Sequence, residues 1–311
     1  MPIDIRMICF ALRRSTIVIM LMFCGTLLAG DVAIVSSGDA RPYQEARDSA
    51  KDRLQRAGHT VTTLLYSDLT TASITRLSRQ NAVLTIGADA ALGLRNKLSP
   101  NTLIVFCLAS DASTLTAGDS HLMHGVLSEI SPATQLVLMA SAFPKARRLG
   151  VLYNSQSERS LRYLNDARQS LPQGWSLQAI SVDTQVSPAK AIDALLELQV
   201  DVVWTIPDPE VYNNTMTRAL LLAALRARVP VFGFSRAFVK AGALLGLGID
   251  AHNQGSQAAS LVNRLLKEPS ANAVLEQPSF QIIINDIVAE KLSIDLPKSF
   301  YRQASEIIKP E

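Results

Sequence analysis

The sequence contains little cysteine, and most of it lies near one end. Only three of the 311 residues are cysteines. Cys9 and Cys24 fall within the first thirty residues, so no intramolecular disulfide can form in the rest of the chain. Phe23 stands where lipidation of Cys24 would require a small residue, so we do not expect a lipoprotein. Because Cys107 lies in the apolar run 103–108, we expect a small core side chain rather than a reactive thiol.

The sequence also lacks the motifs of common enzyme classes. Neither a P-loop nor a Gly-x-Gly-x-x-Gly fingerprint follows a predicted strand. Residues 233–237, Gly-Phe-Ser-Arg-Ala, resemble a nucleophile elbow, but Ala237 replaces the closing glycine and His252 is the only histidine downstream. His121 and His124 have no third histidine or cysteine nearby, so we expect solvated loop histidines. We therefore predict no catalytic residues, no metal site and no cofactor, with an exported serine hydrolase as a remote alternative.

A surplus of charge of one sign is missing too. The chain has 30 basic and 27 acidic residues. Three arginines and one aspartate lie in the first thirty residues, so residues 31–311 carry 27 basic and 26 acidic residues, a net charge of +1. Nucleic-acid-binding proteins usually present a basic stripe or a recognisable reading motif. We find neither, and we predict no nucleic-acid partner.

Only the N-terminus carries an extended hydrophobic run. Three arginines precede the apolar segments 15–23 and 26–28, and Ala29 and Gly30 offer small residues for cleavage. This run is shorter than the roughly 18 to 20 residues that a membrane-spanning helix needs. We therefore predict a signal peptide over residues 1–30, cleaved near residue 29 or 30, and export to the periplasm. A permanent membrane anchor is the alternative.

What the sequence does contain is a regular alternation of short apolar runs and amphipathic stretches of helical period. This pattern is typical of parallel α/β units. In a first series we expect strands at 31–35, 60–65, 82–86 and 102–108 and helices at 42–57, 71–79 and 90–97. In a second we expect strands at 148–153, 176–182, 201–206 and 231–234 and helices at 132–143, 158–171, 188–198 and 214–228. The sequence thus predicts an α/β fold of two doubly wound parallel-sheet lobes.

The remaining segments connect and complete the two series. We expect a linking strand at 125–127, and a tail with a helix at 256–266, a strand at 281–284 and short helices at 287–292 and 301–308. No low-complexity linker separates the lobes. The chain should therefore cross a shared, multi-strand hinge several times.

Polar residues follow most of the predicted strands. In open parallel sheets, ligands collect outside the carboxyl ends of the strands, where helix N-termini present unpaired N–H groups. Each such residue could simply cap a helix. Facing each other across a cleft, however, they would offer donors and acceptors to a small polar ligand. The candidates are Ser36, Ser37, Gly87, Ala88, Asp89, Ser110, Asp111, Asn154, Ser157, Pro207, Asp208 and Ser235, with Tyr43, Phe106, Tyr153, Trp204 and Phe234 as possible apolar walls.

One stretch of the second series resembles a known family. Residues 229–250, Val-Pro-Val-Phe-Gly-Phe-Ser-Arg-Ala-Phe-Val-Lys-Ala-Gly-Ala-Leu-Leu-Gly-Leu-Gly-Ile-Asp, are followed by Gly255 and by Ala258-Ala259. This segment is similar to the substrate-binding components of ABC transporters, in the group that includes tryptophan and tyrosine binders. The likeness continues through a closing segment at Asn285, Ala289, Leu292 and Pro297. Together with the strand order it covers most of residues 31–308.

The resemblance implies a type I periplasmic-binding-protein fold that holds a small organic ligand between two hinged lobes. It implies a first lobe of residues 31–125 and 250–277 and a second of residues 126–249 and 278–311. It also adds Ser128, near the first crossing, to the candidate binding residues. The implied partner is an inner-membrane ABC permease, and the alternative is a periplasmic ligand sensor that signals to a membrane kinase or receptor. We expect a monomer.

The chain departs from this family at Gly87-Ala88-Asp89. Relatives that resemble the aromatic amino-acid binders carry a small hydroxyl residue and a proline here, where a helix N-terminus receives a carboxylate. Asp89 would neutralise the positive helix end and repel an anion. The sequence therefore supports a neutral or cationic ligand as well as an amino acid.

Overall fold

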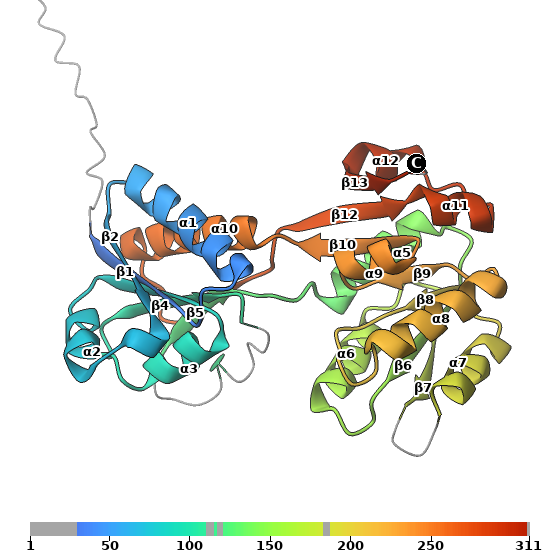
Figure 1. The fold of residues 1–311 in the computed structure, drawn as a ribbon, viewed down its shortest axis with the longest axis horizontal. Coiled ribbons are helices and arrows are strands. Elements are labelled where there is room, and N and C mark those ends of the chain that lie inside the picture. The colour runs from blue at the N-terminus through green and yellow to red at the C-terminus, as the bar shows by residue number, and fades with distance from the viewer. Residues whose placement is uncertain (1–29, 110–114, 117–120, 183–186, 310–311) are drawn as a thin grey trace, which may run out of the picture.

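The protein consists of two α/β lobes that lie side by side and are joined by several chain segments (Figure 1). The structure is a computed structural model, and it describes residues 30–109, 115–116, 121–182 and 187–309. The first lobe is built on a six-stranded sheet and the second on a seven-stranded sheet. The predicted α/β fold of two mostly parallel lobes is confirmed. Residues 1–29 of the predicted signal peptide lie outside the described residues.

The sheet of lobe 1 is entirely parallel. Its strand order is β11-β5-β4-β3-β1-β2. β1 lies between β2 and β3, so the strand order reverses beside it. The strands are β1 (Asp31–Ser36), β2 (Thr60–Leu65), β3 (Ala82–Ile86), β4 (Leu103–Cys107), β5 (Met123–Val126) and β11 (Leu275–Glu276). β3 is buried along its whole length, as a parallel strand covered on both faces must be.

Helices cover the two faces of this sheet with separate cores. α1 (Arg41–Arg56) and α10 (Ala251–Lys267) pack on one face, and α2 (Thr71–Leu77) and α3 (Ala88–Arg95) pack on the other, while a 3-10 turn, Tyr66–Asp68, follows β2. α1 and α10 lie unusually close together, because a Cβ atom at Gly255 would stand 2.0 Å from the Ala46 carbonyl oxygen. Only glycine permits this approach. Cys107 is completely buried in this lobe, which confirms the expected core position.

The sheet of lobe 2 is parallel except at one edge. Its strand order is β13-β12-β10-β9-β8-β6-β7, and only the β10–β12 pair is antiparallel. The strands are β6 (Arg148–Tyr153), β7 (Ser176–Ser181), β8 (Val202–Trp204), β9 (Val231–Gly233), β10 (Leu245–Ile249), β12 (Phe280–Asn285) and β13 (Ala304–Ile308). The helices are α5 (Pro132–Ala142), α6 (Glu158–Gln169), α7 (Pro188–Glu197), α8 (Asn214–Arg226), α9 (Arg236–Ala241), α11 (Asp286–Leu292) and α12 (Lys298–Gln303). α5 packs beside α6 and α7 beside α8, and all seven helices share one hydrophobic core.

The chain crosses between the lobes three times, as the prediction of several crossings requires (Figure 1). Residues 127–131 lead from β5 to α5, Asp250 joins β10 to α10, and residues 277–279 lead from β11 to β12. Two glutamines of α10 hold these segments together: the Gln254 side-chain amide donates to the Leu127 carbonyl, and that of Gln257 donates to the Gln277 carbonyl. The crossings therefore form one hydrogen-bonded hinge.

Several elements differ from the sequence prediction. Residues 301–308 were expected to form a helix, but β13 occupies 304–308, because this segment pairs with β12 at the edge of the lobe 2 sheet. β10 and α9 were not predicted. Gly246 and Gly248 weaken the strand pattern of β10, yet a Cβ at Gly246 would lie 2.6 Å from the Gly233 carbonyl oxygen, so close packing requires glycine there.

Among the residues that the structure describes, no helix combines the length and the apolar character needed to cross a membrane.

Candidate functional site

A cavity of about 350 Å³ lies in lobe 2 beside the first crossing between the lobes. Its walls come from the residues that follow β8 and β9, from the end of β10, and from α5, α6 and the crossing segment 127–131. These are carboxyl ends of parallel strands, where ligand sites are expected in open sheets. The lining residues are Ser128, Glu129, Ile130, Gln135, Arg159, Tyr163, Pro207, Phe234, Ser235, Arg236, Ala237, Leu247, Gly248 and Ile249.

Two buried polar atoms of this cavity have no partner within the described part of the chain. These are the Ser128 hydroxyl oxygen and Nε of Arg159. The Arg159 guanidinium is oriented by an ion pair between its Nη2 and the Glu129 carboxylate, so Nε is held in place while it stays unsatisfied. A buried polar atom without a hydrogen bond costs free energy. A ligand with acceptor groups would remove that cost.

Aromatic side chains form the rest of the cavity. Phe234 and Tyr163 both line it. Burial, and next the negative charge of Glu129, raise the pKa of Tyr163, so its hydroxyl stays protonated and donates to the Ile130 carbonyl. The cavity thus combines apolar walls with a few fixed polar groups, as small-molecule sites usually do.

A buried layer beneath the cavity fixes the crossing segment. Trp204 is completely buried and donates through its indole nitrogen to the Gln135 side-chain oxygen at 2.8 Å. The Gln135 side-chain amide in turn donates to the Ile130 carbonyl at 2.7 Å. Trp204 and Phe106, both proposed from the sequence as possible ligand walls, are therefore core residues.

The corresponding end of lobe 1 is organised around the start of α3. Gly87 has φ +95°, and a Cβ there would lie 2.5 Å from the Ser37 hydroxyl oxygen. The glycine lets that hydroxyl accept a hydrogen bond from the Ala90 N–H at 2.9 Å. Ala88 and Asp89 form the first turn of α3, and the Asp89 side chain is exposed there. Lobe 1 thus presents a negative charge at this helix end.

The candidate residues that the structure describes separate into three groups. Ser128, Pro207 and Ser235 line the lobe 2 cavity, while Ser36, Ser37, Gly87, Ala88 and Asp89 lie at the end of lobe 1 and are not part of its lining. Asn154, Ser157 and Asp208 serve the local structure of lobe 2. Ser110 and Asp111 lie outside the described residues.

The third group consists of internally satisfied side chains. Asp208 is buried and accepts hydrogen bonds from the Ser160 hydroxyl and from the Glu210 and Val211 N–H groups. Asn154 donates to the Glu210 carboxylate, and Ser157 caps α6. These side chains shape the loops that follow β6 and β8. The structure thus gives them the capping and loop roles that the sequence left open.

The structure places the residues of two further interpretations, the serine hydrolase at Ser235 and the solvated loop histidines. Ser235 caps α9 by accepting from the Phe238 N–H, whereas the one histidine downstream, His252, lies on α10 in lobe 1. His124 is buried in β5 and its Nδ1 accepts from the Val274 N–H, so the expectation of a solvated loop histidine is wrong there. Burial, and then the neighbouring His121, lower the pKa of His124.

Sequence reasoning missed the charged pair of the cavity. Glu129 follows the predicted Ser128 directly, and Arg159 stands in the first turn of α6, two residues after the predicted Ser157. Both residues could have been identified by including, with each loop that follows a strand, the first turn of the next helix. What no sequence rule supplies is their mutual contact across 30 positions.

The chain matches a family model over residues 78–308, and that family is described as ABC transporter substrate binding protein. No curated protein matches the chain in sequence. The family match covers most of the chain, including the crossings, all of lobe 2 from β6 to β13, and the cavity.

Solved structures show the same fold. The ligand-free, open structure of CD0873, a substrate binding protein with adhesive properties from Clostridium difficile, aligns with TM-score 0.71 at 16% identity, covering 91% of this chain and 100% of that one. An ABC domain in complex with L-Trp from Streptococcus pneumonia aligns with TM-score 0.56 at 17% identity, covering 89% and 100%. A XylFII–LytSN complex aligns with TM-score 0.57 at 9% identity, covering 84% and 99%.

Proposed function

This chain belongs to the ABC transporter substrate-binding protein family, and on that premise we propose that it captures a small organic ligand between its two lobes in the periplasm. The ligand then passes to an inner-membrane permease. The observation that carries this proposal is the lobe 2 cavity beside the hinge, where the Ser128 hydroxyl and Arg159 Nε find no partner among the described residues. Binding is non-covalent, and closure follows because the ligand contacts both lobes only when they approach.

The charges of the two lobes suggest the chemistry of the ligand. Arg159 and Ser128 offer donors, so an acceptor group such as a carboxylate, carbonyl or hydroxyl fits lobe 2. Asp89 stands exposed at the start of α3, so lobe 1 favours a neutral or positively charged group. A ligand with an acceptor at one end and an amine or hydroxyl at the other satisfies both lobes.

Further parts of the proposal concern architecture and location. We assign residues 31–125 and 250–277 to lobe 1 and residues 126–249 and 278–311 to lobe 2, and we propose a monomer. We propose that residues 1–30 direct export and are removed near residue 29 or 30. The polar rather than catalytic character of the cavity supports binding without turnover.

A sensor that signals to a membrane kinase or receptor is the second candidate. One protein of the same fold is described in a complex, XylFII–LytSN, which supports the idea that such a clamp can dock on a second protein. Genes next to the one that encodes this chain distinguish the two. A permease and an ATPase favour transport, and a kinase favours sensing.

Thermal-shift screening tests ligand capture. The purified protein is heated with amino acids, nucleosides, vitamins and amines, and a true ligand at about 100 times its Kd adds about 2.7 kcal/mol of stability. Arg159→Gln should weaken binding of that ligand about 30-fold, because a hydrogen bond to a charged group contributes ~2 kcal/mol. Arg168→Gln, an exposed position on the same helix, serves as the matched control. A ligand that binds both variants equally well does not use this cavity.

A further inference from the structure

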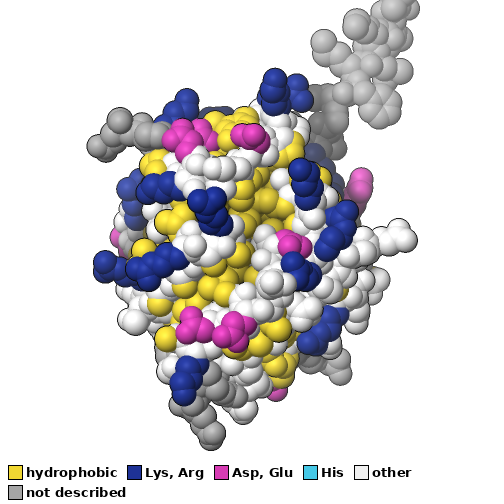
Figure 2. Space-filling model, turned by 90° about the vertical axis from the view of Figure 1, so that its right-hand side faces the viewer, with side chains coloured by type: hydrophobic (Ala, Val, Ile, Leu, Met, Phe, Trp, Pro, Cys, Tyr) yellow, Lys and Arg dark blue, Asp and Glu magenta, His cyan; other side chains and the backbone are white. Residues whose placement is uncertain are grey.

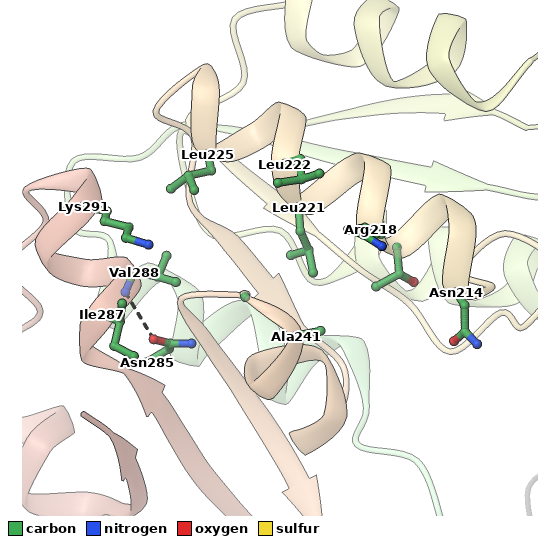
Figure 3. A pocket seen from close by; sticks show the side chains of 12 residues that line it. Asn214, Arg218, Leu221, Leu222, Leu225, Ala241, Asn285, Ile287, Val288 and Lys291 are labelled. Atoms are coloured by element: carbon green, nitrogen blue, oxygen red, sulfur yellow. Dashed lines mark hydrogen bonds between the residues drawn. The ribbon is translucent and has the colours of Figure 1, made fainter. Parts of the chain in front are cut away.

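A second groove lies on lobe 2, apart from the cavity at the hinge. It runs between α8 and α11, with the end of α9 as its base, and has a volume of about 560 Å³ (Figure 3). The two sites share no lining residue. The groove volume lies within the range of about 300 to 1,000 Å³ that is typical of small-molecule sites.

The floor of the groove is apolar. Leu221 and Leu225 are one helical turn apart on α8 and therefore share a face, and Val288 of α11 lies opposite them (Figure 3). Leu222 forms the rim and keeps 47% of its surface exposed. An aliphatic side chain left in water beside an apolar groove gains free energy when a hydrophobic group covers it.

The surface around the groove also combines apolar and basic side chains. α8 and α11 both reach the end of lobe 2 that faces away from lobe 1 (Figure 1). At this end, hydrophobic side chains form a band, basic side chains lie along both sides of it, and acidic side chains also border it (Figure 2).

Two cations stand on opposite walls of the groove. Arg218 belongs to α8, and Lys291 extends from α11 toward α8 (Figure 3). Neither has an ion-pair or hydrogen-bond partner within the described ranges, and the groove lining contains no Asp or Glu. The nearest acids along α11, Asp286 and Glu290, are not part of the lining. The groove therefore presents positive charge that no carboxylate of its own lining offsets.

Two of the three neutral polar side chains of the lining are already engaged, and the third, Asn214, lies beyond Arg218 at one end of the groove (Figure 3). The Asn285 side chain donates to the Val239 carbonyl and accepts from the Val288 N–H. The Thr217 hydroxyl donates to the Tyr212 carbonyl. The charged groups of Arg218 and Lys291 are thus left for a ligand, together with the Asn214 side-chain amide.

We propose that this groove is a second binding site, for a small organic monoanion with an alkyl or aryl tail. The carboxylate pairs with the Arg218 guanidinium, whose planar fork suits two parallel hydrogen bonds. The tail lies over Leu221, Leu222 and Leu225 toward Val288, and Lys291 adds positive charge from the far wall. Occupancy of this site does not depend on the ligand of the hinge cavity.

Octanoate is the probe for this proposal. Isothermal titration of the purified protein should show binding of octanoate, and much weaker binding of acetate, which lacks the tail, and of 1-octanol, which lacks the charge. Arg218→Gln should weaken octanoate binding by about fivefold or more, because a charge-assisted hydrogen bond is lost. Leu222→Asp should abolish it by placing a negative charge on the apolar rim.

Two controls decide where the probe binds. Arg226→Gln changes an exposed basic residue of the same helix that does not line the groove, and it should leave the affinity unchanged. Arg159→Gln changes the hinge cavity and should also have no effect. Absence of octanoate binding, equal loss in the Arg218 and Arg226 variants, or loss in the Arg159 variant would each overturn the proposal. Ligand capture at the hinge could still stand in every one of these cases.

Discussion

The two lobes are built on the same plan but finish their facing ends differently. In lobe 1 the Ser37 hydroxyl is used by the start of α3, and the unpaired hydroxyl of Ser36 is completely buried. In lobe 2 the Ser128 hydroxyl and Arg159 Nε, which have no partner in the part of the chain that the structure describes, both belong to residues that line a cavity. The end of lobe 1 therefore uses the Ser37 hydroxyl internally, whereas we propose that the groups at the end of lobe 2 bind a ligand.

This difference suggests an order of events. We expect a ligand to form its first strong hydrogen bonds on lobe 2, where the donors are held by the Glu129 ion pair and by the Gln135 layer. We expect lobe 1 to contribute mainly on closure, through the exposed carboxylate of Asp89 and the backbone near Gly87. The comparison therefore predicts that substitutions in the two lobes change protein stability and ligand affinity differently.

Among these predictions, the largest effect on stability is expected from crowding the contact between α1 and α10. It should destabilise lobe 1. In Gly255→Ala the new methyl group meets the backbone of Ala46, so the helices must separate at a cost of about 3 kcal/mol. Cys107 reports this lobe: burial raises its pKa to about 12, so its thiol reacts only after unfolding. In protein that starts at residue 31, Cys107 is the only cysteine, and its labelling in urea should begin at a lower denaturant concentration in the Gly255→Ala variant.

Lobe 2 supplies the counterpart of this experiment. Both tryptophans of the chain, Trp175 and Trp204, belong to lobe 2, so fluorescence follows its unfolding. Gly246→Ala should lower the fluorescence midpoint, whereas Gly255→Ala should leave it nearly unchanged. Asn253→Ala, at an exposed position of α10, controls for a new helical alanine. If labelling and fluorescence always shift together, the lobes unfold as one unit and the comparison fails at the level of stability.

The sequence was sufficient for the general plan of both lobes. Strands such as Val202–Trp204 are apolar on both faces, so the alternation of apolar runs with helical periods could be read directly. β10 was not predicted because Gly246 and Gly248 lack the side chains by which a strand is recognised. β13 was not predicted because its strand conformation depends on pairing with β12. Residues 304–308 do not encode this pairing by themselves.

The candidate site was predictable only in part, for a similar reason. Ser128, Pro207 and Ser235 follow strands or a crossing, so position along the chain identified them. Arg159 lies within a helix rich in charged residues, and nothing in its neighbours marks it. Its importance comes from a contact with Glu129 and from an unsatisfied nitrogen, and both depend on how α6 meets the crossing segment.

Removing one hydroxyl from each facing end should produce opposite results. Ser37→Ala deletes the acceptor for the Ala90 N–H and should destabilise lobe 1 by ~1 kcal/mol, with little change in ligand affinity. Ser128→Ala should leave stability unchanged or slightly raised, and it should weaken binding about fivefold, because a lost hydrogen bond is worth ~1 kcal/mol. Thiol labelling and titration of the identified ligand measure the two quantities. The reverse pattern would mean that lobe 1 holds the donors that matter.

Acid should reveal the smallest difference between the lobes. In lobe 2, a hydrogen bond from Arg236 holds the pKa of Glu306 below its ordinary value of 4.5, and in lobe 1 a hydrogen bond from Arg47 lowers the pKa of Asp39 below 3.8. Because each folded-state pKa is lower, each pair stabilises its lobe fully above the unfolded pKa and loses that contribution as pH falls through the folded pKa.

The two pairs should nevertheless differ in size. The Glu306 side chain is 25% exposed and that of Asp39 is 55% exposed, so water screens the lobe 1 pair more strongly. Glu306→Gln should cost lobe 2 ~0.5 kcal/mol at neutral pH and flatten the fluorescence-detected loss of stability between about pH 6 and pH 3. Asp39→Asn should change thiol labelling of lobe 1 much less over the same range. Equal effects in the two lobes would show that burial does not distinguish these carboxylates.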